Sequence, residues 1–229
     1  MSTLIAIETS TECCSAALLR DGTLSARSEL APRRHAELIL PMIESLLDEA
    51  GVSRRQLDAI AVGRGPGAFT GVRLAISVAQ GLALALDIPV VPVSSLAALA
   101  QDAPAGVGET ILAVIDARMG EIYAGCFQRS ANGLVEGIDD ESVGLADELI
   151  IPPAHSIVGS GWAAYAEALS RRLKNAPAFA DGARYPQARA IAQLAAPQFA
   201  AGHSVAPELA LPVYLRDKVA LTLQEQRAR

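Results

Sequence analysis

The chain has 229 residues, a formal net charge of -6 and a sequence pI near 5.1. This length suits one large domain or two small ones, with enough chain to bury a core. The acidic balance argues against a free-standing nucleic-acid-binding protein, which usually carries a basic face. No segment has the length and apolarity of a convincing membrane span, and the amino terminus has no signal-peptide layout. The sequence therefore predicts a cytoplasmic protein without a membrane segment.

The cysteines and histidines do not form a recognisable site. Cys13 and Cys14 are adjacent, the third cysteine is Cys126, and the three histidines lie far apart in the sequence. This pattern is neither a disulfide framework nor a zinc motif, so we expect no metal and no cofactor, and we expect buried thiols. A catalytic Cys/His pair is the alternative that the sequence leaves open.

The first thirty residues predict three strands. Leu4–Glu8 is a strand, Cys14–Arg20 a second, and Thr23–Leu30 a third after the hairpin signal Asp-Gly. The polar turn after the first strand favours a plain hairpin. The alternative is a phosphate held by its hydroxyls and backbone, which makes Thr9 and Ser10 candidate nucleotide-binding residues.

An amphipathic helix is predicted from His35 to Ala50, and Gly51 ends it. Its apolar residues recur at helical spacing and form a stripe that faces a core. Leu38 and Met42 widen this stripe beyond what one core contact requires. Such a band is most often core, but it is also suited to a partner.

A glycine-rich turn, Gly63–Arg73, follows the apolar strand Leu57–Val62 and leads into a helix that ends near Leu86. Glycines here permit unusual backbone angles and let another group approach closely. Thr70 is the expected cap of this helix. Unpaired N–H groups at such a turn suit an anion, so Gly65 and Gly67 are candidate phosphate contacts. A tight turn without a ligand is the equally weighted alternative.

The helix after this turn is apolar nearly all round. Between residues 72 and 86 its clearly polar side chains are Arg73, Ser77 and Gln80. A helix of this kind is normally covered on more than one side, either by its own domain or by a second chain. The candidate partner-binding residues on the two helices are Leu38, Met42, Leu46, Val72, Ile76, Ala79 and Ala83.

The second half repeats the opening layout. A strand at residues 88–93 and a short helix lead to a boundary at residues 103–108, after which strands at 110–115 and 121–127 flank a turn. This repetition predicts two related halves, 1–105 and 106–229. In the second turn, Asp116, Arg118 and Glu121 form either a charged site or, more commonly, a salt-bridged hairpin. Beyond it we expect a strand at 156–159, helices at 162–173 and 187–201, an extended segment at 212–216 and a polar tail.

Four stretches in this order resemble the TsaB (YeaZ) family. They are Ile5-Ala6-Ile7-Glu8-Thr9-Ser10-Thr11, Gly63–Arg73, Val90-Val91-Pro92-Val93-Ser94-Ser95-Leu96 and Asp116-Ala117-Arg118-Met119-Gly120-Glu121-Ile122-Tyr123. The resemblance implies an α/β protein with the two-subdomain actin/hexokinase/Hsp70-like (ASKHA) fold. It also implies a role in making threonylcarbamoyladenosine in tRNA, as a non-catalytic subunit that binds the catalytic subunit TsaD. The implied partners further include the ATPase TsaE, a second copy when the chain is alone, and tRNA only through the complex.

Two departures from the catalytic paralogue support a non-catalytic role. The positions that match its metal-binding H-x-x-x-H are Ser95 and Leu99, which cannot replace two imidazoles. Its Gly-Gly turn is matched here by Ala117 and Arg118, whose side chains would crowd a phosphate. The alternative class is an enzyme, either a metallopeptidase or a sugar-kinase-like ATPase.

Overall fold

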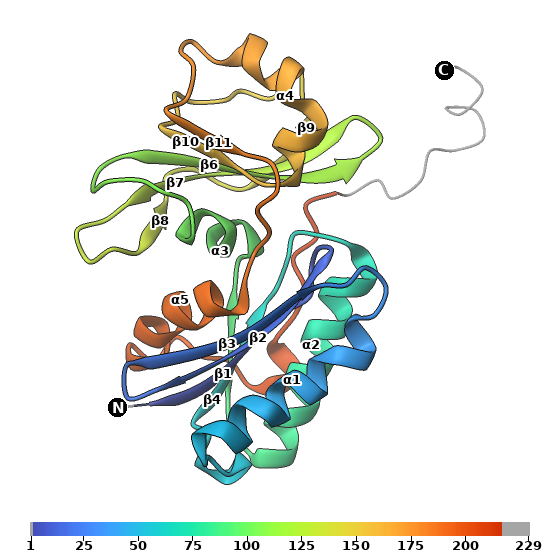
Figure 1. Ribbon diagram of the computed structural model, residues 1–229, viewed down its shortest axis with the longest axis vertical. Coiled ribbons are helices and arrows are strands. Elements are labelled where there is room, and N and C mark those ends of the chain that lie inside the picture. The colour runs from blue at the N-terminus through green and yellow to red at the C-terminus, as the bar shows by residue number, and fades with distance from the viewer. Residues whose placement is uncertain (1, 217–229) are drawn as a thin grey trace.

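The computed structural model describes residues 2–216, which build two β-sheets with helices on their faces (Figure 1). The first sheet has the strand order β3-β2-β1-β4-β5. The three opening strands are antiparallel, whereas β4 and β5 run parallel to β1. The three-strand start expected from the sequence is confirmed. The bounds are β1 Thr3–Glu8, β2 Cys13–Arg20, β3 Thr23–Leu30, β4 Ala59–Gly63 and β5 Val90–Val93.

Two helices cover one face of this sheet: α1, His35–Ala50, and α2, Phe69–Leu86. They bury the stripes of apolar residues that the sequence places at helical spacing. Gly51 ends α1 in the left-handed conformation with φ of 60°, as expected of a C-terminal glycine. A short 3-10 turn, η1 (Arg54–Gln56), connects α1 to β4. The two predicted helices are therefore confirmed, and together they form one layer.

The second sheet has the order β11-β10-β6-β7-β8, and β9 also pairs with β7. Its centre is the long antiparallel hairpin that β6 and β7 form, which confirms the predicted repetition of the strand–turn–strand layout. Helix α4 (Ser160–Arg172) covers the outer face of this sheet. The bounds are β6 Thr110–Arg118, β7 Glu121–Arg129, β8 Val135–Gly137, β9 Ser142–Leu145, β10 Ser156–Val158 and β11 Phe179–Asp181.

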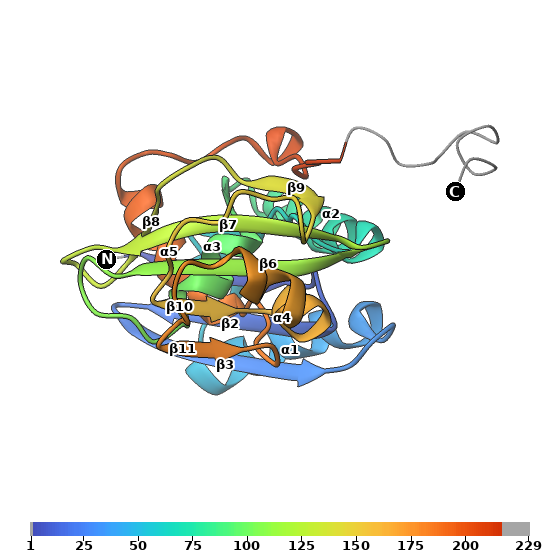
Figure 2. The same cartoon turned by 90° about the horizontal axis from the view of Figure 1, so that it is seen from above.

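Two helices lie between the sheets, and each belongs by sequence to the half opposite the sheet on which it packs (Figures 1 and 2). Helix α3, Ser95–Gln101, packs on the second sheet, whereas α5, Ala188–Ala200, packs on the first. Arg189 of α5 forms a salt bridge with Asp102, which follows α3, at 2.8 Å. The division at residue 105 remains a prediction, and the chain crosses between the sheets on both sides of it.

The last described segment, residues 205–216, is here named the C-terminal strap. It starts with a bridge between Val205 and Val90, passes along α2 as the turn η2 (Pro207–Leu209), and reaches the glycine-rich turn, where the Val213 N–H donates to the Arg64 carbonyl. Arg216 then bonds Glu121 and, at 2.9 Å, the Ala117 carbonyl in the second sheet's hairpin. The strap thus joins the two sheets. The predicted polar tail lies outside the described residues.

Candidate functional site

The β1–β2 turn packs directly against the glycine-rich turn. A Cβ atom at Gly67 would lie 2.4 Å from the Ser10 carbonyl oxygen, and one at Gly71 would lie 2.1 Å from the Thr9 carbonyl oxygen. The Ala68 N–H donates to Ser10 at 2.7 Å, and the Thr9 hydroxyl donates to the Gly71 carbonyl at 2.7 Å. The close approach expected of these glycines is therefore real, and the approaching group is the chain's own backbone.

This packing places the candidate nucleotide-binding residues. Ser10 and Gly67 line a cavity described below, whereas the Thr9 hydroxyl is already bonded to the glycine-rich turn. Gly65 has φ of 90°, which an L side chain rarely adopts. Nucleotide binding remains a prediction. The expected cap at Thr70 is wrong, because α2 begins at Phe69 and Ala68, which has no capping hydroxyl, occupies the cap position.

Glu8 closes β1 with a carboxyl group that is fully buried. Its two oxygens accept from the Ser10 N–H at 2.6 Å and from the Ser95 hydroxyl at 2.7 Å. Burial raises the pKa of Glu8 above its usual value, and these hydrogen bonds only partly offset the effect. Gly63 makes room for the group, since a Cβ there would lie 2.0 Å from a carboxyl oxygen. The position that matches the paralogue's first histidine thus serves a buried carboxyl group.

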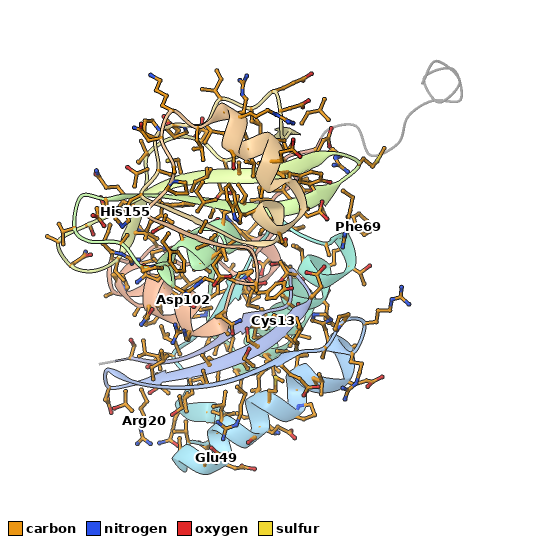
Figure 3. All side chains as sticks on the ribbon, turned by 45° about the horizontal axis from the view of Figure 1, so that its top comes forward. Cys13, Arg20, Glu49, Phe69, Asp102 and His155 are labelled. Atoms are coloured by element: carbon orange, nitrogen blue, oxygen red, sulfur yellow. The ribbon has the colours of Figure 1, made fainter. Side chains whose placement is uncertain are left out.

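A cavity of about 480 Å³ lies between the β1–β2 turn, the start of α2, the β6–β7 hairpin and the C-terminal strap. Figure 3 shows Phe69 at the start of α2, on the side of the hairpin. Its lining includes Ser10, Thr11, Glu12, Val72, Arg73, Ile115, Asp116, Arg118, Tyr123, Val213, Tyr214 and Arg216.

The charged residues of the second hairpin form two separate pairs. Arg118 contacts Asp116 at 2.8 Å and reaches across the cavity to Glu12 at 3.2 Å. Glu121 instead pairs with Arg216 of the strap. The salt-bridged hairpin is therefore confirmed for Asp116 and Arg118. Glu121 instead forms its ion pair with the C-terminal strap, a contact that the sequence pattern alone does not reveal.

The candidate partner residues divide into two groups. Five of them face the chain's own first sheet with at most 4% exposure, so the structure corrects the expectation that a partner contacts them: Leu46, Val72, Ile76, Ala79 and Ala83. They are the residues that attach α1 and α2 to the sheet. Leu38 and Met42 are only partly buried and border the outer surface of this layer.

The outer surface of α2 is apolar or small along its length. Ser77, Gly81, Leu84 and Ala85 are exposed, and Leu84 keeps 62% of its surface. Leu40 of α1 is 46% exposed, and Met42 is partly buried. We name the outer surface of α1 and α2 the docking face. Its residues could have been found from the same helical pattern by taking the positions opposite the sheet.

The described residues show no arrangement for metal or thiol chemistry. Between residues 2 and 216 no three His, Cys, Asp or Glu side chains gather as metal ligands. Leu99, the second position of the paralogue's motif, lies in the core. Burial raises the pKa of Cys14 to about 12 and that of Cys126 to about 11, which keeps both thiols protonated at neutral pH.

Comparison with known proteins decides the family. The chain is 43% identical to the tRNA threonylcarbamoyladenosine biosynthesis protein TsaB of Escherichia coli, over 95% of this chain and 96% of that one. It is 38% identical to TsaB of Haemophilus influenzae, over 95% and 94% of the two chains. The chain belongs to the TsaB family. The predicted role in tRNA threonylcarbamoyladenosine modification is thereby confirmed.

Structure comparison supports the same conclusion for the fold. YeaZ from Pseudomonas aeruginosa superimposes with a TM-score of 0.85 at 46% identity, covering 94% of this chain and all of that one. Residues 27–223 also match the family described as TsaD, tRNA N6-adenosine threonylcarbamoyltransferase. The predicted actin/hexokinase/Hsp70-like fold of this TsaB-family chain is confirmed, and the family is related in sequence to the transferase itself.

Proposed function

We propose that this TsaB-family chain is a non-catalytic partner subunit whose docking face binds the catalytic transferase TsaD. The observation that carries the proposal is the exposed apolar surface of α1 and α2. The complex with TsaD is cytoplasmic, TsaE belongs to it, and tRNA contacts this chain only through it. A second copy of this chain occupies the docking face when the transferase is absent. The relation of the chain to the transferase family favours such a pairing, because two copies of one fold often meet through equivalent surfaces.

Gly81 is the most informative residue of the docking face. It lies in the middle of α2, is exposed, and a Cβ there would meet nothing within 4 Å. Glycine at such a position destabilises a helix by about 1 kcal/mol relative to alanine, and the chain itself gains nothing in return. A second helix that crosses α2 at Gly81 would explain its presence, because glycine lets two backbones approach closely.

Helix α2 is also long and apolar enough to cross a membrane by length and composition. In the structure it packs instead as a layer on the first sheet, with Val72, Ile76 and Ala83 among its buried residues. Its exposed face is narrower and continues across the neighbouring surface of α1. This surface suits a protein partner, since exposed apolar patches commonly mark protein interfaces.

The groups around the cavity support a non-catalytic role. The Ser95 hydroxyl donates a hydrogen bond to the Glu8 carboxyl group, and Leu99 lies in the core with 1% of its surface exposed. The Arg118 side chain lies between Asp116 and Glu12, in the turn where the paralogue has two glycines. A chain with this arrangement contributes to the modification through binding.

Binding to purified TsaD from the same organism tests the proposal, with Gly81→Arg as the main variant. Its long side chain points to open space in the free chain and arginine favours a helix more than glycine does, so we expect a melting temperature no lower than that of the parent and at least a hundredfold loss of affinity by calorimetry. Ala164→Arg, on the exposed side of α4, is the matched control and should bind normally. A charge at Ala79 is unsuitable, because that residue is fully buried and the change would unfold the protein.

Reconstitution of tRNA modification completes the test. We expect modification only when this chain is present, and we expect Gly81→Arg to lose it in proportion to lost binding. Undiminished binding by Gly81→Arg would contradict the docking face. ATP turnover or peptide cleavage by the homogeneous chain alone would instead contradict the non-catalytic role.

A further inference from the structure

Arg73 occupies an unusual environment in the first turns of α2. Its guanidinium lies 3.2 Å from the centre of the Phe69 ring and 4.9 Å from that of the Tyr214 ring. Stacking of this kind is favourable and fixes the orientation of a guanidinium. Within residues 2–216 Arg73 forms no ion pair, and its Nη1 atom is buried without a hydrogen-bond partner. The aromatic rings thus orient a cation that the described chain does not neutralise.

The same cavity has a further donor without an acceptor. Thr11 is 6% exposed, and its hydroxyl has no hydrogen-bond partner within residues 2–216. It lines the cavity together with Arg73 and the start of α2, where Ala68 supplies no capping side chain. A helix N-terminus carries partial positive charge, which favours an anion there. Three independent features therefore place a hydrogen-bond donor and positive charge on the lining of this cavity.

Two carboxylates also line the cavity. Glu12 and Asp116 both contact Arg118, so one cation is shared by two carboxylates. A second negative charge on a ligand would be repelled by this excess of carboxylates. The apolar lining residues include Val72 and Ile115. The volume of about 480 Å³ is within the range of small-molecule sites.

We propose that this cavity binds a small monoanion of the carboxylate class, with its carboxylate at Arg73 and an apolar part along Val72 and Ile115. Multiply charged phosphates, including nucleotides, fit poorly, because Glu12 and Asp116 line the same cavity and repel additional negative charge. Arg73 is the residue that sets the preference for a carboxylate. The proposal is independent of the docking face, and its failure would leave the binding of TsaD intact.

Calorimetry on the full chain with N-acetyl-L-valine, and with its neutral carboxamide as the matched probe, tests the charge requirement. We expect saturable binding of the acid and at least tenfold weaker binding of the carboxamide. Arg73→Gln should weaken the binding of the acid by at least tenfold and leave the affinity for the carboxamide unchanged. Arg171→Gln, an exposed arginine of α4, is the control and should bind as the parent chain does.

Three results would overturn the proposal. These are equal binding of acid and carboxamide, retained acid binding by Arg73→Gln in a folded chain, and tighter binding of inorganic phosphate or ATP than of the acid. Folding of Arg73→Gln is checked by its melting temperature. Gly81→Arg, which is expected to lose TsaD, should bind the acid as the parent chain does, and this result separates the test from that of the proposed function.

Discussion

The two strand–turn–strand hairpins that face each other across the cavity are held in opposite ways. The β1–β2 turn is buried from Glu8 to Thr11, and the backbone at Gly67 and Gly71 packs directly on it. The β6–β7 turn is exposed, and Arg118 and Met119 adopt left-handed backbone angles with φ of 67° and 60°. Ion pairs hold the second turn, whereas backbone contact holds the first.

This difference indicates which of the two turns can change its conformation. Backbone-to-backbone packing tolerates no added atom, so the first turn is a fixed structural element. The Arg118 side chain is 73% exposed, and ion pairs of exposed side chains contribute only about 0 to 1 kcal/mol, so the tip of the second turn can shift at little cost. A cavity with one rigid and one adaptable wall can accommodate a ligand without disturbing the first sheet.

Gly71→Ala should have the largest effect. The new methyl group would lie 2.1 Å from the Thr9 carbonyl oxygen, so either α2 or the first turn must move. We expect a loss of about 3 kcal/mol in the free energy of unfolding, measured by urea denaturation. Gly81→Ala is the matched control in the same helix, where open space and better helix propensity should stabilise the chain by about 1 kcal/mol. Equal effects of the two substitutions would show that the first turn is not fixed by packing.

The buried Glu8 carboxyl group makes the free energy of unfolding depend on pH. Its pKa is raised in the folded chain, so folding retains a proton that the unfolded chain releases. The resulting stability is complete below the unfolded pKa and is lost as pH rises through the folded value. Glu8→Gln keeps a polar group of the same size without this titration. We therefore expect the variant to gain stability relative to the parent as the pH rises above 4.5, the ordinary pKa of this carboxyl group.

Urea titrations at several pH values measure this difference. Glu136→Gln is the control, since Glu136 is exposed and forms no ion pair within residues 2–216. Its stability should follow that of the parent at every pH. A constant difference between Glu8→Gln and the parent would mean that Glu8 does not take up a proton on folding.

Much of the fold could be predicted because local signals agree with it. The periodicity of α1 and the Asp-Gly turn between β2 and β3 give elements close to those observed. The tolerance of glycine for close approach was likewise predictable from the turn that contains Gly67 and Gly71. The approaching group was not, because Thr9 and Ser10 are about sixty residues away in the chain and only the folded sheet brings them near.

Partner contacts were predicted less well for a related reason. An apolar stripe shows that one face of a helix is buried, but it does not say whether the chain's own sheet or a partner buries it. Ala79 of α2 was therefore a partner candidate although it faces the sheet, whereas the polar Ser77 lies on the exposed side. The crossing of α3 and α5 between the sheets and the course of the C-terminal strap depend on contacts distant in sequence. No local pattern encodes these contacts.

The smallest expected effect belongs to the second hairpin. Met119→Gly removes the cost of about 1 kcal/mol that an L side chain incurs in the left-handed region, although glycine also gains freedom in the unfolded chain. The Met119 side chain is 60% exposed, so its removal sacrifices little packing. We expect a net stabilisation of about 0.5 kcal/mol in urea denaturation, and Met119→Ala, which retains the Cβ atom, should show none. A loss above about 1 kcal/mol in Met119→Gly would place this turn with the rigid hairpin and remove the contrast between the two walls of the cavity.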